Sequence, residues 1–264
     1  MTRLEQKFKE TRAEGRIAFM PFLVAGDPDL ETSVSIAKTI ASPADLLEIG
    51  FPYSDPLADG PTIQAADIRA LGAGMDTDHV FTYIKKVRES TDVPITVLVY
   101  ANIVYQKGIE RFYTEAKAAG VDGVLIPDVP VEEIEPFAQA AAKAGIDPIF
   151  LVAHTTTPER LKKILRYAKG YLYVVSVLGV TGARASLSAD MPKLLKRIRR
   201  QTDLPLAVGF GISKREHIAL LEKQGADGAI VGSALVKTIT DNLSNKKRLL
   251  QNISAQVKQL TGAD

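Results

Sequence analysis

Three carboxylates stand close together in a segment that is otherwise apolar and rich in proline. Glu48 follows Leu46 and Leu47 in a short apolar run, and Asp55 and Asp59 come next within LLEIGFPYSDPLADGP. A carboxylate in apolar surroundings should have a raised pKa, because the loss of water disfavours its charged form. Such a group can both donate and accept a proton near neutral pH. Glu48 is therefore the candidate general acid and base.

Each of these residues also has an explanation that involves no chemistry. Glu48 could pair with a buried lysine or arginine, although the ends of the other apolar runs offer no evident cation. Asp59 lies in ADGP, where an Asp-Gly turn explains it equally well, and Asp55 before Pro56 is interpreted as a turn residue. Tyr173 is an ordinary core residue by its surroundings, but its hydroxyl could reach Glu48 or a ligand.

Glycine-rich segments follow three later apolar runs and indicate a site for a phosphate. They are LGVTGAR (Leu178–Arg184), GFGIS (Gly209–Ser213) and VGSALV (Val231–Val236). Glycine lets backbone N–H groups approach an anion, and a helix that begins at Gly232-Ser233 would direct its N-terminus at one. Ordinary tight turns are the alternative. The length of the first segment predicts a mobile lid.

The apolar runs belong to a pattern that repeats about every 30 residues and predicts the fold. A helical segment ends in a small or glycine-containing turn, and an aspartate and a short apolar run follow. The copies are SPADLLEI (Ser42–Ile49), AGVDGVLI (Ala119–Ile126), AGIDPIFL (Ala144–Leu151) and QGADGAIV (Gln224–Val231). Four more apolar runs are predicted as strands: Ile17–Val24, Ile95–Tyr100, Tyr171–Ser176 and Pro205–Gly209.

Eight strands that alternate with helices favour an α/β fold in which a parallel sheet closes into a (β/α)8 barrel. The competing architecture is an open doubly wound sheet, but no GxGxxG follows the first strand. The predicted helices between strands are Glu31–Ile40, Ile109–Ala119, Val131–Ala144, Pro158–Ala168, Met191–Arg200 and Lys214–Gln224. Extra helices are predicted at Arg3–Glu14, between Thr62 and Ser90, and from Leu243 onward. No linker divides the chain, so we expect residues 1–264 to form one domain.

In such barrels the chemistry lies at the C-terminal ends of the strands. The proposed phosphate site and acid–base pair would then share one mouth, with apolar walls from Phe22, Leu98, Tyr100, Leu125, Leu151 and Phe210. This describes a pocket for a flat apolar group attached to a phosphorylated chain.

Composition excludes several other classes of function. The net charge is +2, which gives no electrostatic case for nucleic acid or a membrane surface. The chain has no cysteine, and its three histidines are isolated, so we expect no disulfide and no metal site. The N-terminus lacks the apolar core of a signal peptide, and no apolar run approaches membrane-spanning length. We therefore expect a cytoplasmic protein.

The sequence resembles the tryptophan synthase alpha chain family along its whole length. The matching segments are PFLVAGDP (Pro21–Pro28), LLEIGFPYSDPLADGPTIQ (Leu46–Gln64), LVYANIVY (Leu98–Tyr105), GVLIPDVP (Gly123–Pro130), GVTGAR and VGFGIS. The resemblance implies a TIM barrel that cleaves indole-3-glycerol phosphate to indole and glyceraldehyde 3-phosphate, in tryptophan biosynthesis, without a cofactor of its own.

The resemblance also assigns roles residue by residue. Glu48 matches the general acid and base, Asp59 the carboxylate that accepts a hydrogen bond from the indole N–H, and Tyr173 the tyrosine near the cleaved bond. The substrate-binding positions that match are Phe22, Ile63, Leu98, Tyr100, Leu125, Thr181, Gly182, Phe210, Gly211, Gly232 and Ser233. Among these, Thr181 is a lid residue that closes near Asp59.

The family resemblance further implies a partner. The loop Phe51–Gly60 would face a tryptophan synthase beta chain, a pyridoxal phosphate enzyme that consumes the indole, in an alpha2-beta2 heterotetramer. Two alternatives remain at this stage: a stand-alone lyase that releases free indole, and a barrel that binds the phosphate ligand and activates a partner with little turnover of its own.

Overall fold

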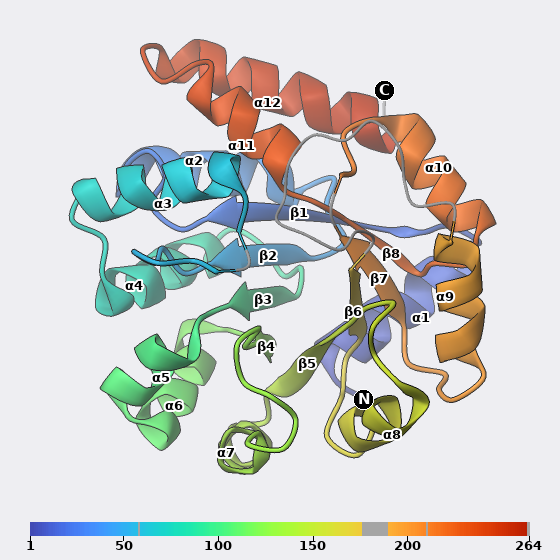
Figure 1. The fold of residues 1–264 in the computed structure, drawn as a ribbon. Helices are drawn as coiled ribbons and strands as arrows, with labels where there is room; N and C mark the ends of the chain where they lie inside the picture. Colours follow the sequence, from blue (N-terminus) through green and yellow to red (C-terminus); the bar gives the residue numbers. More distant parts are fainter. Residues whose placement is uncertain (58, 176–189, 210, 263–264) are drawn as a thin grey trace.

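A closed parallel barrel forms the centre of the molecule (Figure 1). The computed structural model describes residues 1–57, 59–175, 190–209 and 211–262. Within them, the strands follow one another around the barrel in sequence order: β1 (Ala18–Val24), β2 (Leu47–Gly50), β3 (Ile95–Leu98), β4 (Gly123–Leu125), β5 (Asp147–Val152), β6 (Leu172–Val175), β7 (Leu206–Gly209) and β8 (Gly228–Val231). Pairing of β8 with β1 closes the ring. The predicted barrel is confirmed, and the open doubly wound sheet is excluded.

Helices surround the barrel, as Figure 1 shows. They are α1 (Arg3–Ala13), α2 (Leu30–Ala41), α3 (Pro61–Gly72), α4 (Thr77–Arg88), α5 (Ala101–Lys107), α6 (Ile109–Ala119), α7 (Glu135–Ala144), α8 (Pro158–Ile164), α9 (Met191–Arg199), α10 (Arg215–Lys223), α11 (Ser233–Thr240) and α12 (Lys246–Thr261). The extra helices predicted at both ends and between Thr62 and Ser90 are present; the last of these regions holds two helices, α3 and α4.

Some helix boundaries differ from prediction for identifiable reasons. The segment predicted from Val131 becomes helical only at Glu135, where Pro136 fits the first turn because its missing N–H has no helical partner there. Helix α8 ends at Ile164, shorter than predicted. Helix α5 was not predicted, because a seven-residue helix is too short to leave a periodic apolar pattern.

The aspartate of the repeat has a structural role. In three of the four copies its carboxylate accepts a hydrogen bond from the backbone N–H of the first or second residue of a neighbouring strand. The pairs are Asp45 with Phe19 at 2.9 Å, Asp122 with Ile95 at 2.9 Å, and Asp227 with Leu206 at 2.7 Å. Each of these carboxylates also pairs with an arginine. The aspartate of the repeat therefore joins neighbouring strands by a hydrogen bond at the N-terminal end of the barrel, which explains why the repeat predicts strands.

Helix α1 closes that N-terminal end. Leu4 and Phe8 are buried, and the strands make room for them with glycine. A Cβ at Gly123 would lie 3.0 Å from a Leu4 methyl carbon, and one at Gly228 would lie 3.3 Å from the Phe8 ring. The Phe8 ring also packs on Tyr171, with 5.7 Å between ring centroids. The interior of the barrel is therefore a packed core with one open end.

Among the residues whose positions the structure describes, no helix combines the length and apolar character needed to cross a membrane. No three side chains of histidine, aspartate or glutamate come together there in a way that would hold a metal ion.

Candidate active site

Glu48 lies on β2 and points into the barrel near its open end. Its strand register places it beside Phe22 of β1 on one side and Thr96 of β3 on the other. The residue is 1% exposed. Among the described residues, no lysine, arginine or histidine forms an ion pair with Glu48. The alternative that Glu48 pairs with a buried cation therefore finds no support in this part of the chain.

The surroundings of Glu48 favour its neutral form. The pKa of Glu48 is raised to about 8: burial is the largest cause, a hydrogen bond from Tyr171 opposes the rise, and the charge of Asp59 adds to it. The Tyr171 hydroxyl donates to Oε1 of Glu48 at 3.2 Å. Oε2 of Glu48 has no hydrogen-bond partner within the described residues. The predicted rise in pKa is therefore present, and one carboxyl oxygen has no protein partner in that part of the chain.

Tyr171 was not predicted as a site residue. It precedes β6 and stands two positions before Tyr173, so the alternation of a strand directs both side chains into the barrel. Its hydroxyl lies 3.4 Å from Oγ1 of Thr96 as well as within reach of Glu48. The period of two between the tyrosines was the available signal.

Asp59 is held by its side chain at the entrance of the site. The Tyr100 hydroxyl donates to Oδ2 of Asp59 at 2.8 Å. Burial raises the pKa of Asp59, and the hydrogen bond from Tyr100 opposes this rise. The next residue, Gly60, has φ −85° and ψ 172° and serves as the N-cap of α3. This is extended backbone, so Gly60 does not take the positive φ of a glycine in a tight Asp-Gly turn.

Tyr173 completes the group of predicted catalytic residues. It is 6% exposed, and its pKa is raised well above the ordinary value by burial first, then by the charges of Glu48 and Asp59. A Cβ at Gly209 would lie 2.1 Å from the Tyr173 hydroxyl. The absence of a side chain at Gly209 is therefore what lets the phenol occupy this place, and the three predicted residues meet in one region.

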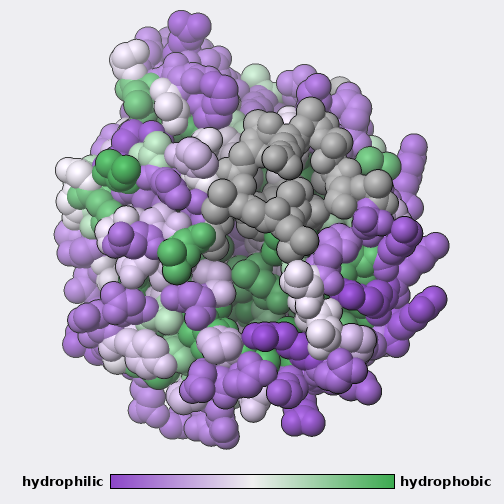
Figure 2. All heavy atoms as spheres, in the orientation of Figure 1, coloured by the Kyte–Doolittle hydropathy of each residue, from purple (hydrophilic) through white to green (hydrophobic). Residues whose placement is uncertain are grey.

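Apolar side chains form the walls around these groups. Phe22, Ile63, Tyr100 and Leu125 are buried, and Leu98 is partly buried. Leu98 and Leu125 are register partners on β3 and β4. Figure 2 shows apolar side chains gathered in a hollow near the middle of the face that it presents, with mostly hydrophilic residues below it.

Glycine also shapes the wall at Phe22. A Cβ at Gly50 would lie 2.6 Å from the tip of the Phe22 ring, and one at Gly232 would lie 3.2 Å from its Cδ1. The ring therefore fills the space left by two glycines, one at the end of β2 and one just after β8.

The predicted phosphate end is described in part. Helix α11 begins at Ser233, directly after Gly232, and has no acidic residue in its first turn. Gly211 has φ 77°, a conformation that glycine adopts without strain. Thr181, Gly182 and Phe210, together with the predicted lid Leu178–Arg184, lie outside the described residues.

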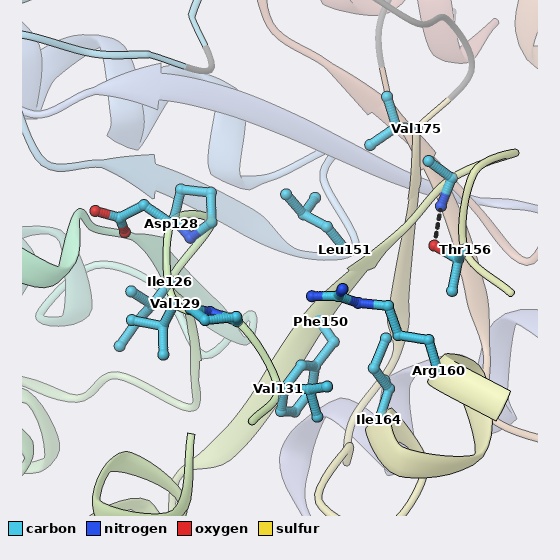
Figure 3. A pocket seen from close by; sticks show the side chains of 13 residues that line it. Ile126, Asp128, Val129, Val131, Phe150, Leu151, Thr156, Arg160, Ile164 and Val175 are labelled. Atoms are coloured by element: carbon cyan, nitrogen blue, oxygen red, sulfur yellow. Dashed lines mark hydrogen bonds between the residues drawn. The ribbon is translucent and has the colours of Figure 1, made fainter. Parts of the chain in front are cut away.

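A cavity of about 410 Å³ lies between the loop after β4 and the segment that follows β5 (Figure 3). Leu151, which we predicted as a wall residue, lines it together with Phe150, Val131 and Arg160. Glu48 and Asp59 are not among its lining residues. The position of the carboxylates, and not the size of this cavity, therefore locates the candidate active site.

Comparison with known proteins gives the family. Residues 8–263 match the family model described as tryptophan synthase alpha chain. The chain is 51% identical over 264 residues to the tryptophan synthase alpha chain of Methanoregula boonei, which covers 100% of this chain and 98% of that one. It is 49% identical to that of Methanothermobacter thermautotrophicus, over 96% of this chain and 93% of that one.

Solved structures agree in fold. A chain of the tryptophan synthase a2b2 complex of Pyrococcus furiosus superposes with a TM-score of 0.87 at 40% identity, over 93% of this chain and 98% of that one. Tryptophan synthase subunit alpha of Legionella pneumophila gives a TM-score of 0.91 at 34% identity, over 100% and 98% of the two chains. With its fold and its sequence in agreement, this chain belongs to the tryptophan synthase alpha chain family.

Proposed function

We propose that the open end of the barrel is the active site at which this chain cleaves indole-3-glycerol phosphate to indole and glyceraldehyde 3-phosphate, with Glu48 as general acid and base. This cleavage is the reaction of the family, and it makes the chain a carbon–carbon lyase of tryptophan biosynthesis. The observation that supports the role of Glu48 is a carboxyl group buried at the barrel mouth, with one oxygen unpartnered within the described residues and a pKa raised to about 8.

Glu48 would transfer two protons in sequence, so that it ends as it began. Its neutral carboxyl first protonates C3 of the indole, which turns the ring into an electron sink. The resulting carboxylate then takes the proton of the substrate hydroxyl, the carbon–carbon bond breaks, and its electrons return to the ring. A pKa near 8 suits both transfers, because general acid–base catalysis is most effective when the pKa lies near the working pH.

Asp59 would stabilise the positive charge that develops on the ring nitrogen. It accepts the Tyr100 hydroxyl with one oxygen, Oδ2, and the carboxylate would accept the indole N–H as well. A fixed negative charge accelerates the reaction when its attraction to the substrate is strongest in the transition state. Because the carboxylate is already in place, it does not need to move as the charge develops. Tyr173, whose pKa is raised by the charges of Glu48 and Asp59 in addition to burial, would lie near the cleaved bond.

The remaining residues would bind the substrate. Phe22, Ile63, Leu98, Tyr100 and Leu125 would enclose the indole, whose flat apolar surface matches their buried side chains. Gly211, Gly232 and Ser233 would hold the phosphate, since the start of α11 offers backbone N–H groups without a nearby acidic residue. Gly182, Phe210 and Thr181 would complete these two subsites.

The partner would be a tryptophan synthase beta chain. The Pyrococcus furiosus relative is a chain of a tryptophan synthase a2b2 complex, and we propose the same alpha2-beta2 heterotetramer here. In this family the alpha chain uses no cofactor of its own, and pyridoxal phosphate belongs to the beta chain. We further propose that residues 1–264 act as one domain and that the protein works in the cytoplasm.

The test is indole release from indole-3-glycerol phosphate by the purified chain, measured with and without a beta chain. Weak activity alone and strong activation by the partner would support a lyase that works within the complex. High activity alone without activation would favour a stand-alone lyase. No indole under either condition would contradict the proposal and favour a barrel that only binds the ligand.

Changing Tyr171 to phenylalanine should shift the pH dependence of indole release upward. The Tyr171 hydroxyl stabilises the carboxylate form of Glu48, so its loss should raise the pKa of Glu48 further. The measurement is the pH dependence of kcat for both proteins between pH 6 and 10. An unchanged profile would show that this hydrogen bond does not tune the acid.

A further inference from the structure

The position of the Asp59 carboxyl group depends on the side chain of Tyr100. The side-chain amide of Gln64 donates to the backbone carbonyl oxygen of Asp59 at 2.8 Å, which holds the main chain of this residue. Its carboxyl group is held separately, by the 2.8 Å hydrogen bond from the Tyr100 hydroxyl to Oδ2. The direction of the Tyr100 phenol therefore decides where the charge of Asp59 lies.

The main chain of Tyr100 is fixed by contacts that do not act on its ring. Tyr100 is the N-cap of α5 and has extended backbone, with φ −78° and ψ 146°. The backbone N–H of the next residue, Ala101, donates to Oδ1 of Asp128 at 2.9 Å, which ties the start of α5 to the loop after β4. These contacts place the Cα atom of Tyr100, whereas its hydroxyl lies at the far end of a side chain that can rotate about its own bonds.

The ring of Tyr53 lies against the ring of Tyr100. The two centroids are 4.8 Å apart and the two planes are inclined by 21°, which is a stacked arrangement. Stacked aromatic pairs are favourable beyond the area that they bury. A ring that lies flat on one face of Tyr100 opposes rotation of the phenol out of its plane, and so keeps the hydroxyl directed at Asp59.

Tyr53 can give this support because the start of its loop is anchored in the core. Phe51 is 3% exposed, and its ring packs on those of Phe81 and Phe112, with 5.7 Å between centroids in each pair. Only Pro52 separates Phe51 from Tyr53, and a proline ring fixes the backbone angle φ at its position. Tyr53 is therefore held in place although it is only partly buried.

We propose that Tyr53 is a positioning residue of the active site: its ring keeps the Tyr100 phenol directed at Asp59 and thereby holds the Asp59 carboxylate in place. The inference rests on the function proposed above for Asp59. Tyr53 acts through Tyr100 and does not contact the reacting atoms. The aromatic ring of Tyr53, and not its hydroxyl, produces the effect, so phenylalanine should replace it and an aliphatic side chain should not.

The first test compares Tyr53→Leu with Tyr53→Phe. Leucine removes the stacked ring, whereas phenylalanine keeps it. We expect kcat for indole release to fall roughly 3–10-fold in Tyr53→Leu, which corresponds to the strength of one stacked pair, and Tyr53→Phe to keep most of the activity. The full chain is measured without a beta chain, because Tyr53 lies in the loop that would face this partner and a lost contact there would imitate the effect.

A double-mutant cycle with Tyr100→Phe tests the route of the effect. Phenylalanine at this position removes the hydroxyl that holds Asp59 but keeps a ring beside Tyr53. In the Tyr100→Phe background the direction of the ring no longer acts on Asp59, so the addition of Tyr53→Leu should lower kcat no further. Two fully additive effects would overturn the proposal, because Tyr53 would then act independently of the Tyr100 hydroxyl.

Tyr105→Leu is the matched control. Tyr105 lies on α5, the helix that Tyr100 caps, and its ring contacts that of Phe137 with 5.2 Å between centroids. The variant removes a ring contact of the same helix that involves neither Tyr100 nor Asp59. In the full chain alone it should leave kcat unchanged. A fall as large as that of Tyr53→Leu would overturn the proposal, because the loss of any ring contact on this helix would then disturb the site.

A second readout does not depend on turnover. Burial raises the pKa of Asp59 and the hydrogen bond from Tyr100 lowers it, so loss of this bond should raise the pKa. The measurement is the pH titration of the ¹³C shift of the Asp59 carboxyl carbon, assigned with Asp59→Asn. The pKa should rise in Tyr53→Leu and in Tyr100→Phe, but not in Tyr53→Phe. The titratable groups whose charges act together with that of Asp59 are kept in every variant: Glu48, Asp67 and Tyr173.

The two readouts keep the proposals apart. If the wild type releases no indole, the proposed function fails, and the pKa of Asp59 alone decides whether Tyr53 positions the carboxylate. An unchanged pKa in Tyr53→Leu would overturn the positioning role whatever the activity. Should Tyr53→Leu fail to fold, Tyr53→Met takes its place, since methionine also lacks a ring, and a raised pKa of Asp59 would again be the supporting result.

Discussion

Glu48→Gln is expected to lower kcat for indole release by roughly 10²–10⁴-fold, the usual contribution of a general acid and base. Glutamine keeps the shape of the side chain and its ability to accept the Tyr171 hydroxyl, but it carries no transferable proton. The measurement is steady-state indole release at saturating substrate. Activity within a few-fold of the wild type would refute the role of Glu48 and favour a barrel that only binds the ligand.

The same variant should be more stable than the wild type at neutral pH. With a folded-state pKa of about 8 against an ordinary value of 4.5, the folded protein holds a proton that the unfolded chain releases. Stability therefore falls as pH rises through this window, by about 1.4 kcal/mol per pH unit at most. Glutamine does not titrate, so its advantage should grow from pH 4.5 to 8 and reach about 3 kcal/mol at pH 7.

A suitable control is Asp147→Asn. Asp147 is also a buried carboxylate, but it lies at the N-terminal end of β5, where it accepts the Thr2 hydroxyl at 2.7 Å. Its replacement should leave kcat unchanged. Loss of activity in this control as well would mean that removal of any buried carboxylate disturbs the barrel.

Asp59→Asn should lower kcat by roughly 10²–10³-fold, which is the effect of removing one preorganised electrostatic contact to a transition state. The asparagine carbonyl can still accept the Tyr100 hydroxyl, so the loop should keep its place. What is lost is the negative charge opposite the ring nitrogen. Because that charge matters most in the transition state, KM should change much less than kcat.

Asp55→Asn provides the comparison within the same loop. The Asp55 carboxylate accepts the neighbouring Ser54 hydroxyl at 2.7 Å and is exposed. For the isolated chain, its replacement should not alter kcat. If Asp59→Asn instead raised KM with kcat unchanged, Asp59 would be a binding residue and not a catalytic one.

The sequence predicted the barrel well because the repeat has a physical cause at each step. Glycines such as Gly120, Gly145 and Gly225 end helices with positive φ, and the aspartates at the next turn fasten strands together. These contacts are local or lie between neighbouring strands, so a single sequence reveals them. Helix α5 was missed because its seven residues, of which only Val104 is buried, are too few to show a periodic apolar pattern.

The site was predicted less completely, and Tyr171 shows why. Its hydroxyl reaches Glu48 from another strand region, and that contact depends on the closed barrel. Asp67 is another residue that the sequence reasoning passed over: it is buried on α3 with Ile63, Ala66 and Ala70, at the spacing of one helix face.

The ring contact between Phe8 and Tyr171 joins the two ends of the barrel. Phe8 belongs to the helix that closes the N-terminal end, and Tyr171 donates to the carboxyl group at the mouth. Shortening or replacing the first helix to make a minimal barrel would therefore also remove a support beneath the proposed catalytic acid. If Glu48 acts as we propose, the opening residues of the chain contribute indirectly to its proton chemistry.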